Sequence, residues 1–378
     1  MLYLSLGVTL LCTAFLVALT HFALSPQKAI YLVLGRVTIW RGRLGTGWLF
    51  RPASRQGTLV PGGRVVHTPY VLRLNTYDGS GQCVHPDVVC VERGIGFEQW
   101  RYWMAVTPYP FGQHEYENPS VFASHDGLEW RVPKGLRNPI IAAPPRRGEY
   151  NSDPCLLFCR DRLWLYFRQT TLTGLGKESR LWVTSSEDGV IWTDPTEVVA
   201  SESDTLISPS IVFSEGTFMM WTVNASSWPF GLVKRVSTDG LRWKEGSSAS
   251  LTGFQPDRCV WHFQTILDGE RLHALFVSCA GPGGTGARLH YGQSADSGES
   301  WVVRPPMLPQ SHRFEEKFQY RGCLLRAEGH ANLFEVWYSG ISLDGTSTTV
   351  YLPMVLMGDN LLPLGSLEWK KRSHKCHG

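Results

Sequence analysis

The hydrophobic positions of this chain fall in short runs, and a few polar residues separate each run from a second one rich in aromatic side chains. After residue 30 the hydrophobic residues show almost no period of 3.6, so the pattern does not predict long amphipathic helices. Runs of this length, bounded by Gly, Pro, Asn, Asp and Ser, are typical of buried β-strands. The paired runs occur five times, within residues 85–110, 151–169, 207–224, 260–278 and 318–340.

A second repeat follows each of the first four pairs. It begins with Ser, places Asp two positions later, continues through Gly and ends on Trp, as in Ser124–Trp130, Ser186–Trp192, Ser237–Trp243 and Ser294–Trp301. We expect the Asp to accept backbone N–H bonds within a tight turn, and the Gly to supply a positive φ. The Trp is expected to pack between neighbouring sheets. These Asp residues are therefore interpreted as structural, not catalytic.

Repeats at this spacing predict an all-β fold, a five-bladed β-propeller with Asp-Gly hairpin turns. The predicted blades cover residues 82–137, 148–197, 204–248, 257–305 and 315–365, within a propeller domain at 65–370. Residues 68–75 (TPYVLRLN) are predicted to join blade five as its outer strand. That pairing would close the ring and remove an unpaired sheet edge.

The composition agrees with this fold and excludes one class of binding partner. The 378 residues include 38 Gly, 23 Pro and 15 Trp, which suits short strands joined by tight turns. The net charge is +3, and no Lys/Arg run interleaves with aromatic residues, so no nucleic-acid partner is expected. Nine cysteines are present; the odd number argues against a complete disulfide framework, and Cys155 and Cys159 are interpreted as buried hydrophobic residues.

The N-terminus predicts a membrane segment. Residues 2–24 carry no charged side chain and are about long enough to cross a bilayer as a helix. We predict a signal anchor or transmembrane helix at 1–25, followed by a linker at 26–64; a cleaved signal peptide is the alternative. The basic residues after it favour a cytoplasmic propeller under the positive-inside rule. A sugar-handling propeller would instead be membrane-associated or exported, and the extracytoplasmic side is preferred.

One face of the predicted propeller gathers chemistry-bearing side chains. The innermost strand of each blade starts at this face, whereas the Asp-Gly turns lie at the opposite one. The set mixes acids, amides, His, Arg and aromatic rings, which suits a glycan partner. Three acids are candidates for catalysis: Asp87, Asp153 and Glu117. The candidates for substrate binding are His85, Asn118, Asn151, Arg168, Ser208, Trp261, His262, Tyr320 and Arg321.

Several of these residues also have a simpler interpretation. Asp153 could cap a turn, and His262 could be a hydrogen-bonded core histidine. Arg321 could clamp a substrate carboxylate in a bidentate way, or neutralise Asp87 or Asp153 across the axis. No metal ligand set and no cofactor is predicted, although an axial Ca²⁺ ion would be compatible with the Asp and His residues there.

At these residues the chain resembles the five-bladed propeller glycosidases of the arabinanase and β-xylosidase type, and its turn repeat resembles the Asp box of sialidases. Residues 80–345 are most similar to bacterial and phage-associated propeller proteins described as glycosyl hydrolase-like. The glycosidase resemblance implies a base Asp opening blade one and a second Asp opening blade two, which Asp87 in HPDV and Asp153 in NSDP match. The family's general acid is a Glu opening blade three. The matching stretch here is Ile207-Ser208-Pro209-Ser210, so Glu117 is the substitute acid that we expect.

Two hypotheses follow. The first is a glycoside hydrolase-like protein that acts on a glycan, with carboxylates on either side of the scissile bond. The second is a membrane-anchored protein that binds or assembles glycans without catalysis, which the missing Glu of blade three favours.

Overall fold

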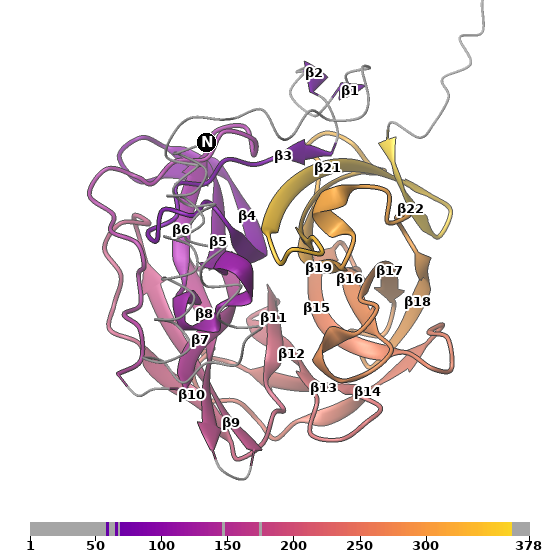
Figure 1. Cartoon of the computed structure of the whole chain (residues 1–378). Helices are drawn as coiled ribbons and strands as arrows, with labels where there is room; N and C mark the ends of the chain where they lie inside the picture. The colour runs from indigo at the N-terminus through magenta and orange to yellow at the C-terminus, as the bar shows by residue number, and fades with distance from the viewer. Residues whose placement is uncertain (1–57, 60–64, 67–68, 146–147, 174–175, 365–378) are drawn as a thin grey trace, which may run out of the picture.

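The structure is a computed structural model that describes residues 58–59, 65–66, 69–145, 148–173 and 176–364. Its strands form five antiparallel units in chain order (Figure 1). Blade one holds β4 (Cys83–Ile95), β5 (Trp100–Pro108) and β6 (Ser120–Ser124), and blade two holds β7 (Glu149–Cys159), β8 (Arg162–Thr173), β9 (Gly176–Ser186) and β10 (Thr196–Ser201). Blade three holds β11 (Ile207–Ser214), β12 (Thr217–Asn224), β13 (Gly231–Ser237) and β14 (Ser247–Thr252). Blade four holds β15 (Cys259–Asp268), β16 (Arg271–Cys279), β17 (Arg288–Ser294) and β18 (Ser300–Pro306), and blade five holds β19 (Phe318–Arg326), β20 (Leu333–Ile341), β21 (Ser347–Met357) and β22 (Asn360–Pro363).

The remaining elements are short. The strands β1 (Thr58–Leu59) and β2 (Val65–Val66) pair with each other, and β14 of blade three pairs in parallel with β18 of blade four. Four single-turn 3₁₀ helices lie in loops: η1 (Pro110–Gly112), η2 (His114–Tyr116), η3 (Pro282–Gly284) and η4 (Arg313–Glu315). The predicted ends of blades two, three and four, at residues 197, 248 and 305, each fall inside the outermost strand.

The first strand of every blade lies at the centre. Contacts run from β4 to β7, then to β11, β15 and β19, and from β19 back to β4, which closes a ring of five. Strands buried on both faces need a nearly continuous hydrophobic sequence, which explains the apolar runs of β4 and β15. The fold is therefore the five-bladed propeller that the repeats predicted.

A ring of hydrogen bonds joins these central strands. In each one, a side chain accepts the backbone N–H of the following blade's central strand. Asp87 accepts from Leu156, Ser210 from Thr265 and Gln264 from Leu324. Two thiols complete the set, because Cys155 accepts from Ile211 and Cys323 from Val88. The five acceptors occupy equivalent positions in the ring, although they are a carboxylate, a hydroxyl, an amide oxygen and two thiols.

The repeated turns have the predicted hydrogen bonds. The carboxylate of Asp126 accepts the N–H groups of Leu128 and Glu129, both at 2.9 Å, and Asp188 and Asp239 do the same in their turns. Each turn is also covered by an aromatic ring from the preceding blade: Trp337 donates to the carbonyl of Gly127, Tyr166 to that of Gly240 and Trp221 to that of Gly298. The outer parts of the blades are thus held by contacts between an aromatic ring and a turn.

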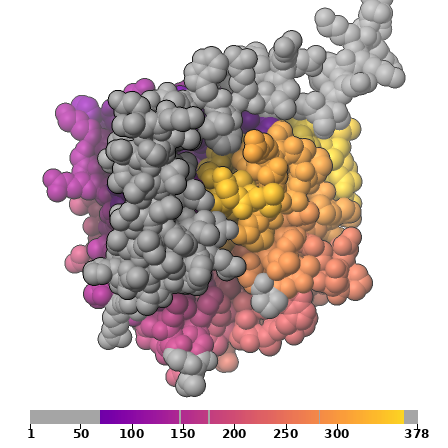
Figure 2. Space-filling model, viewed as in Figure 1, coloured from indigo at the N-terminus to yellow at the C-terminus, as the bar shows by residue number. Residues whose placement is uncertain are grey.

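The ends of the propeller meet at blade five. Strand β3 (Tyr70–Val71) pairs with β21, Val71 opposite Val350, as the sequence predicted for residues 68–75. Figure 2 shows indigo N-terminal residues beside the orange and yellow of blade five. Across the same seam the buried carboxylate of Glu335 accepts hydrogen bonds from Tyr102 of blade one, at 3.1 Å, and Tyr351 of blade five, at 3.2 Å.

The predicted N-terminal membrane segment at 1–25 and the linker at 26–64 lie almost wholly outside the described residues. Among the residues that are described, no helix is both long and apolar enough to cross a membrane.

Substituting Gly189 by Ala should destabilise the propeller strongly. Gly189 has φ +75°, and an added Cβ would lie 2.0 Å from the ring of Trp103. We expect a loss of about 3 kcal/mol in the free energy of unfolding, from backbone strain plus the collision. Gly216→Ala is the matched control, since Gly216 has φ +79° and open space around it, and should cost only about 1 kcal/mol. Equal costs in urea unfolding would show that Trp103 does not cover the turn.

Glu335→Gln should remove a pH dependence of stability. Burial raises the pKa of Glu335 to about 7, although the two tyrosine hydroxyls oppose the shift. Because the folded protein holds this proton more tightly than the unfolded chain, stability should fall between about pH 4.5 and pH 7. The Gln variant should gain up to about 3 kcal/mol at pH 8 and almost nothing at pH 4, measured by unfolding at both pH values. The exposed Glu187→Gln should show no such difference.

Candidate functional site

A cavity of about 550 Å³ opens where the central strands begin. Its lining comes from the inner strands, from the adjoining ends of β8, β9 and β20, and from loops between strands. The lining residues are His85, Tyr109, His114, Glu117, Tyr150, Asp153, Arg168, Leu172, Lys177, Asp204, Ile207, Ala225, Phe230, Trp261, His262, Gly283, Phe318, Tyr320 and Ile341.

The backbone places three inner-strand residues in the same way. His85, Asp153 and Ser208 each precede a proline and each have a positive φ, of 59°, 50° and 53°. In all three strands the register with the second strand shifts at this point, as in a β-bulge. In each of these strands, the side chain that accepts the next blade's N–H lies two residues further along. His262 and Arg321 have the same position relative to the acceptors of blades four and five. The ring therefore brings five corresponding positions together at its cavity end.

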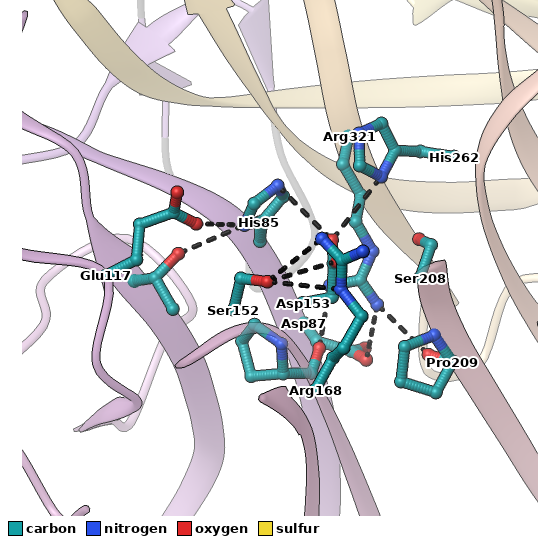
Figure 3. Close-up of polar contacts among 12 residues, drawn as sticks. His85, Asp87, Glu117, Ser152, Asp153, Arg168, Ser208, Pro209, His262 and Arg321 are labelled. Carbon is teal, nitrogen blue, oxygen red and sulfur yellow. Dashed lines mark hydrogen bonds and ion pairs between the residues drawn. The ribbon is translucent and has the colours of Figure 1, made fainter. Parts of the chain in front are cut away.

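Three of these positions meet in a buried cluster (Figure 3). His85 Nε2 lies 3.4 Å from Asp153 Oδ1, and His262 Nδ1 lies 3.5 Å from the same oxygen. All three side chains are buried. Among the residues that the structure describes, these three atoms have no hydrogen-bond partner, nor does His262 Nε2. Polar atoms of this kind are rarely left unpaired in a folded protein, so the cluster points to a bound group.

Asp153 is held as a carboxylate. Burial alone would raise its pKa, but Arg168, with help from His85 and His262, outweighs burial and holds the pKa well below its usual range. Arg168 Nε lies 2.9 Å from Asp153 Oδ2, and Arg168 Nη1 lies 2.8 Å from Asp204 Oδ1. The arginine thus occupies one oxygen of Asp153 and leaves the other facing the histidines. Burial lowers the pKa of both His85 and His262, so both imidazoles are neutral.

Glu117 is the second acid of the cavity. It follows η2, and its Oε2 lies 3.6 Å from His85 Nδ1. Burial raises its pKa well above the usual range, and the negative charge of Asp153 adds to the effect. Asp153 and Glu117 thus face one cavity with pKa values shifted in opposite directions, that of Asp153 lowered and that of Glu117 raised.

Asp87 lies elsewhere. It occupies the ring position of blade one, accepts the N–H of Leu156, and pairs with Arg321 Nη2 at 3.4 Å. It is not among the cavity-lining residues. Asp87 and Asp153 do not hold equivalent places in their blades: the residue equivalent to Asp87 in blade two is Cys155, and His85 is equivalent to Asp153.

Arg321 neutralises Asp87, the second of the two roles considered for it. It is fully buried and also donates to the carbonyls of Pro154, at 2.7 Å, and Pro209, at 3.4 Å. Burial raises the pKa of Asp87 to about 6, against the charge of Arg321. The arginine therefore ties three central strands together beneath the cluster.

One wall of the cavity is aromatic. The rings of Trp261 and Tyr320 lie 5.0 Å apart, and Tyr320 lies 4.7 Å from His262 and 5.1 Å from His85. Both residues were predicted to bind substrate, and their position beside the cluster suits the apolar face of a sugar ring.

Three other predicted residues do not line the cavity. Asn151 donates to Asn118 at 3.1 Å and thereby holds the loop that carries Glu117. Ser208 bonds with both backbone groups of Phe263 and joins blades three and four. Several lining residues were not indicated by the sequence. Tyr109, His114 and Asp204 lie between strands, where no repeat predicts the path of the chain, and Lys177 lies near the start of β9.

The cluster fits a divalent cation. Two neutral imidazoles and one carboxylate are common ligands of zinc and related transition metals. In a tetrahedral zinc site the ligand atoms lie about 3.3 Å apart, close to the 3.4 Å and 3.5 Å found here. His85, Asp153 and His262 are thus metal-ligand candidates, a role that the sequence analysis did not assign to them.

Comparison with known proteins finds one curated relative and solved structures of similar fold. No family model matches the chain. A curated relative, the A type blood N-acetyl-alpha-D-galactosamine deacetylase of Flavonifractor plautii, is 27% identical over 323 residues, which cover 71% of this chain. The chain spans only about two-fifths of that relative's length, since the match covers 41% of it.

Solved structures agree on the fold. An N-acetylgalactosamine deacetylase from F. plautii, in complex with blood group B trisaccharide, matches with a TM-score of 0.66 and 23% identity, over 75% of this chain and 94% of that one. A xylan beta-1,4-xylosidase from Bacillus halodurans C-125 matches with a TM-score of 0.58 and 14% identity, over 75% of this chain and 55% of that one. The expected likeness to five-bladed propeller glycosidases is confirmed at the level of fold.

His262→Ala should abolish tight binding of a divalent cation. Loss of one of three ligands should weaken Zn²⁺ or Mn²⁺ binding by at least about tenfold, measured by titration calorimetry on chelator-treated protein. His114→Ala is the control, because His114 lines the same cavity outside the cluster and should leave the affinity unchanged. Equal affinities for wild type and His262→Ala would contradict the assignment.

Proposed function

We propose that the cavity hydrolyses the N-acetyl group of an amino sugar in a glycan, with a divalent cation held by His85, Asp153 and His262. The observation that carries this proposal is the convergence of unpartnered polar atoms from three blades at one buried point.

The carboxylates of the cavity support amide hydrolysis over glycosidic cleavage. A glycosidase needs two carboxyl groups, one on each side of the scissile bond. Asp87 pairs with Arg321 away from the cavity lining, and blade three offers Ser208 where the resemblance implies a Glu. Asp153 is engaged by Arg168 and the two histidines. This distribution favours a reaction that needs one acid and a cation.

The curated relative supports the same reaction. Its name describes removal of the acetyl group from N-acetyl-galactosamine. The solved structure of such an enzyme matches this chain over 94% of its own length.

The chemistry divides among the residues of the cavity. A cation at the cluster would polarise the acetyl carbonyl and activate a water molecule. The oxygen of a water molecule adds to the acetyl carbon, the C–N bond breaks, and acetic acid and a free amine are released. Glu117, whose pKa burial raises, is placed to give its proton to the departing nitrogen, and the proton that the water loses returns to Glu117. The rings of Trp261 and Tyr320 would hold the sugar.

Glycoside hydrolysis is the second candidate. Glu117 and Asp153 line one cavity, and their pKa values are shifted in opposite directions, as an acid and base pair requires. A glycan-binding protein without catalysis is the third outcome. The uncharged residues 2–24 support the proposal of membrane attachment, and the proposed action on a glycan supports extracytoplasmic placement.

The test is an assay that distinguishes deacetylation from glycoside hydrolysis by their products. Oligosaccharides ending in N-acetylgalactosamine or N-acetylglucosamine are incubated with the protein, and free acetate and free monosaccharide are measured separately. We expect acetate without monosaccharide, loss of activity with a chelator, and recovery when Zn²⁺ or Mn²⁺ is restored.

Variants separate the roles. Glu117→Gln should lower kcat by about a hundredfold through loss of the proton donor, whereas the exposed neighbour Glu115→Gln should have little effect. Release of monosaccharide that survives chelation and is lost in Glu117→Gln would replace the deacetylase proposal with the glycosidase. Glycan binding with neither product would leave the non-catalytic alternative.

A further inference from the structure

Two thiols face each other across blade four. Cys259 is the first residue of β15 and Cys279 the last of β16, and they are directly opposite in the strand register. Both are buried, and their Sγ atoms lie 4.0 Å apart. Directly opposite residues of antiparallel strands have Cα atoms about 4.5–5.5 Å apart, which lies within the range of about 4.4–6.8 Å found across disulfides. Side-chain rotation alone would bring the sulfur atoms together.

The surroundings favour a reactive thiol. A hydrogen bond with Cys259 lowers the pKa of Cys279, and the guanidinium of Arg258 adds to the effect. Arg258 Nε donates to Ser278 Oγ at 2.8 Å, and its Nη2 donates to the carbonyl of Gly286. The thiolate is the form that attacks a disulfide, so these groups support exchange at Cys279.

The two thiols stand at the base of a cavity wall. The loop 280–286 leaves β16 directly after Cys279, and its Gly283 lines the cavity. At Gly284 an added Cβ would lie 1.7 Å from the ring of Trp261, so the loop backbone rests on that ring. Trp261 is two residues beyond Cys259 on β15. A covalent link between the cysteines would therefore join both segments that form this wall.

We propose that Cys259 and Cys279 are a reversible disulfide site that fixes loop 280–286 against Trp261. The oxidant is a small disulfide such as oxidised glutathione. The Cys279 thiolate attacks it, which forms a mixed disulfide and releases one glutathione thiolate. Cys259 then attacks Cys279 in the mixed disulfide and releases the second. The two protein thiols lose two electrons, and their protons end on the two glutathione thiols.

The experiment uses the full chain, independently of any catalytic assay. The native protein is treated with oxidised glutathione, free thiols are alkylated after unfolding, and peptides are mapped by mass spectrometry. We expect one peptide pair linked through Cys259 and Cys279, lighter by two hydrogen atoms than the reduced peptides and restored by a phosphine reductant. Quantitative alkylation of both cysteines after oxidation would overturn the proposal.

A second measurement tests the effect on the loop. Oxidation should raise the thermal midpoint by about 5 °C in wild type, and slow amide hydrogen exchange severalfold in residues 281–286. Cys259→Ser should lose both effects, and Cys90→Ser, which leaves the pair intact, should keep them. A linked protein with unchanged exchange in this loop would refute its role in fixing the wall. The comparison of oxidised with reduced wild-type protein needs no variant, so it remains valid even if a variant folds poorly.

Discussion

Five hydrogen bonds between neighbouring central strands set the geometry on which the site depends. Each is a side chain accepting the next blade's backbone N–H, and the acceptors range from the carboxylate of Asp87 to the thiol of Cys323. Because the five central strands are joined at this level, the residues two positions earlier must converge. Three of them are His85, Asp153 and His262, so the buried cluster follows from the symmetry of the ring.

Charge balance decides what this cluster can do. Two carboxylates and two guanidinium groups are buried at the axis, and each carboxylate has its own arginine: Asp87 has Arg321, and Asp153 has Arg168. A buried charge without a partner costs several kcal/mol, so removing either arginine should be more harmful than removing an exposed one. The pairing with Arg321 makes Asp87 part of the framework. The pairing with Arg168 uses only one oxygen of Asp153 and keeps the other available.

The fold could be predicted from the sequence because each propeller blade buries the same faces, so the hydrophobic pattern repeats once per blade. The paired apolar runs predicted five blades, and residues 68–75 were predicted as the closing strand, which β3 forms. The site was harder. The sequence analysis placed Asp87 and Asp153 at the openings of blades one and two, whereas in the structure His85-Pro86 corresponds to Asp153-Pro154 and Ser208-Pro209. Aligning the prolines would have placed His85 beside Asp153. Asp204 could not have been found this way, because no repeat predicts the path of its loop.

Anomalous diffraction from crystals grown with Zn²⁺ or Mn²⁺ tests the central claim most directly. If the ring assembles a cation site, one strong peak should lie between His85 Nε2, Asp153 Oδ1 and the His262 ring, within bonding distance of all three. A cavity whose only density at that point is water, with the metal peaks scattered over surface histidines, would contradict it.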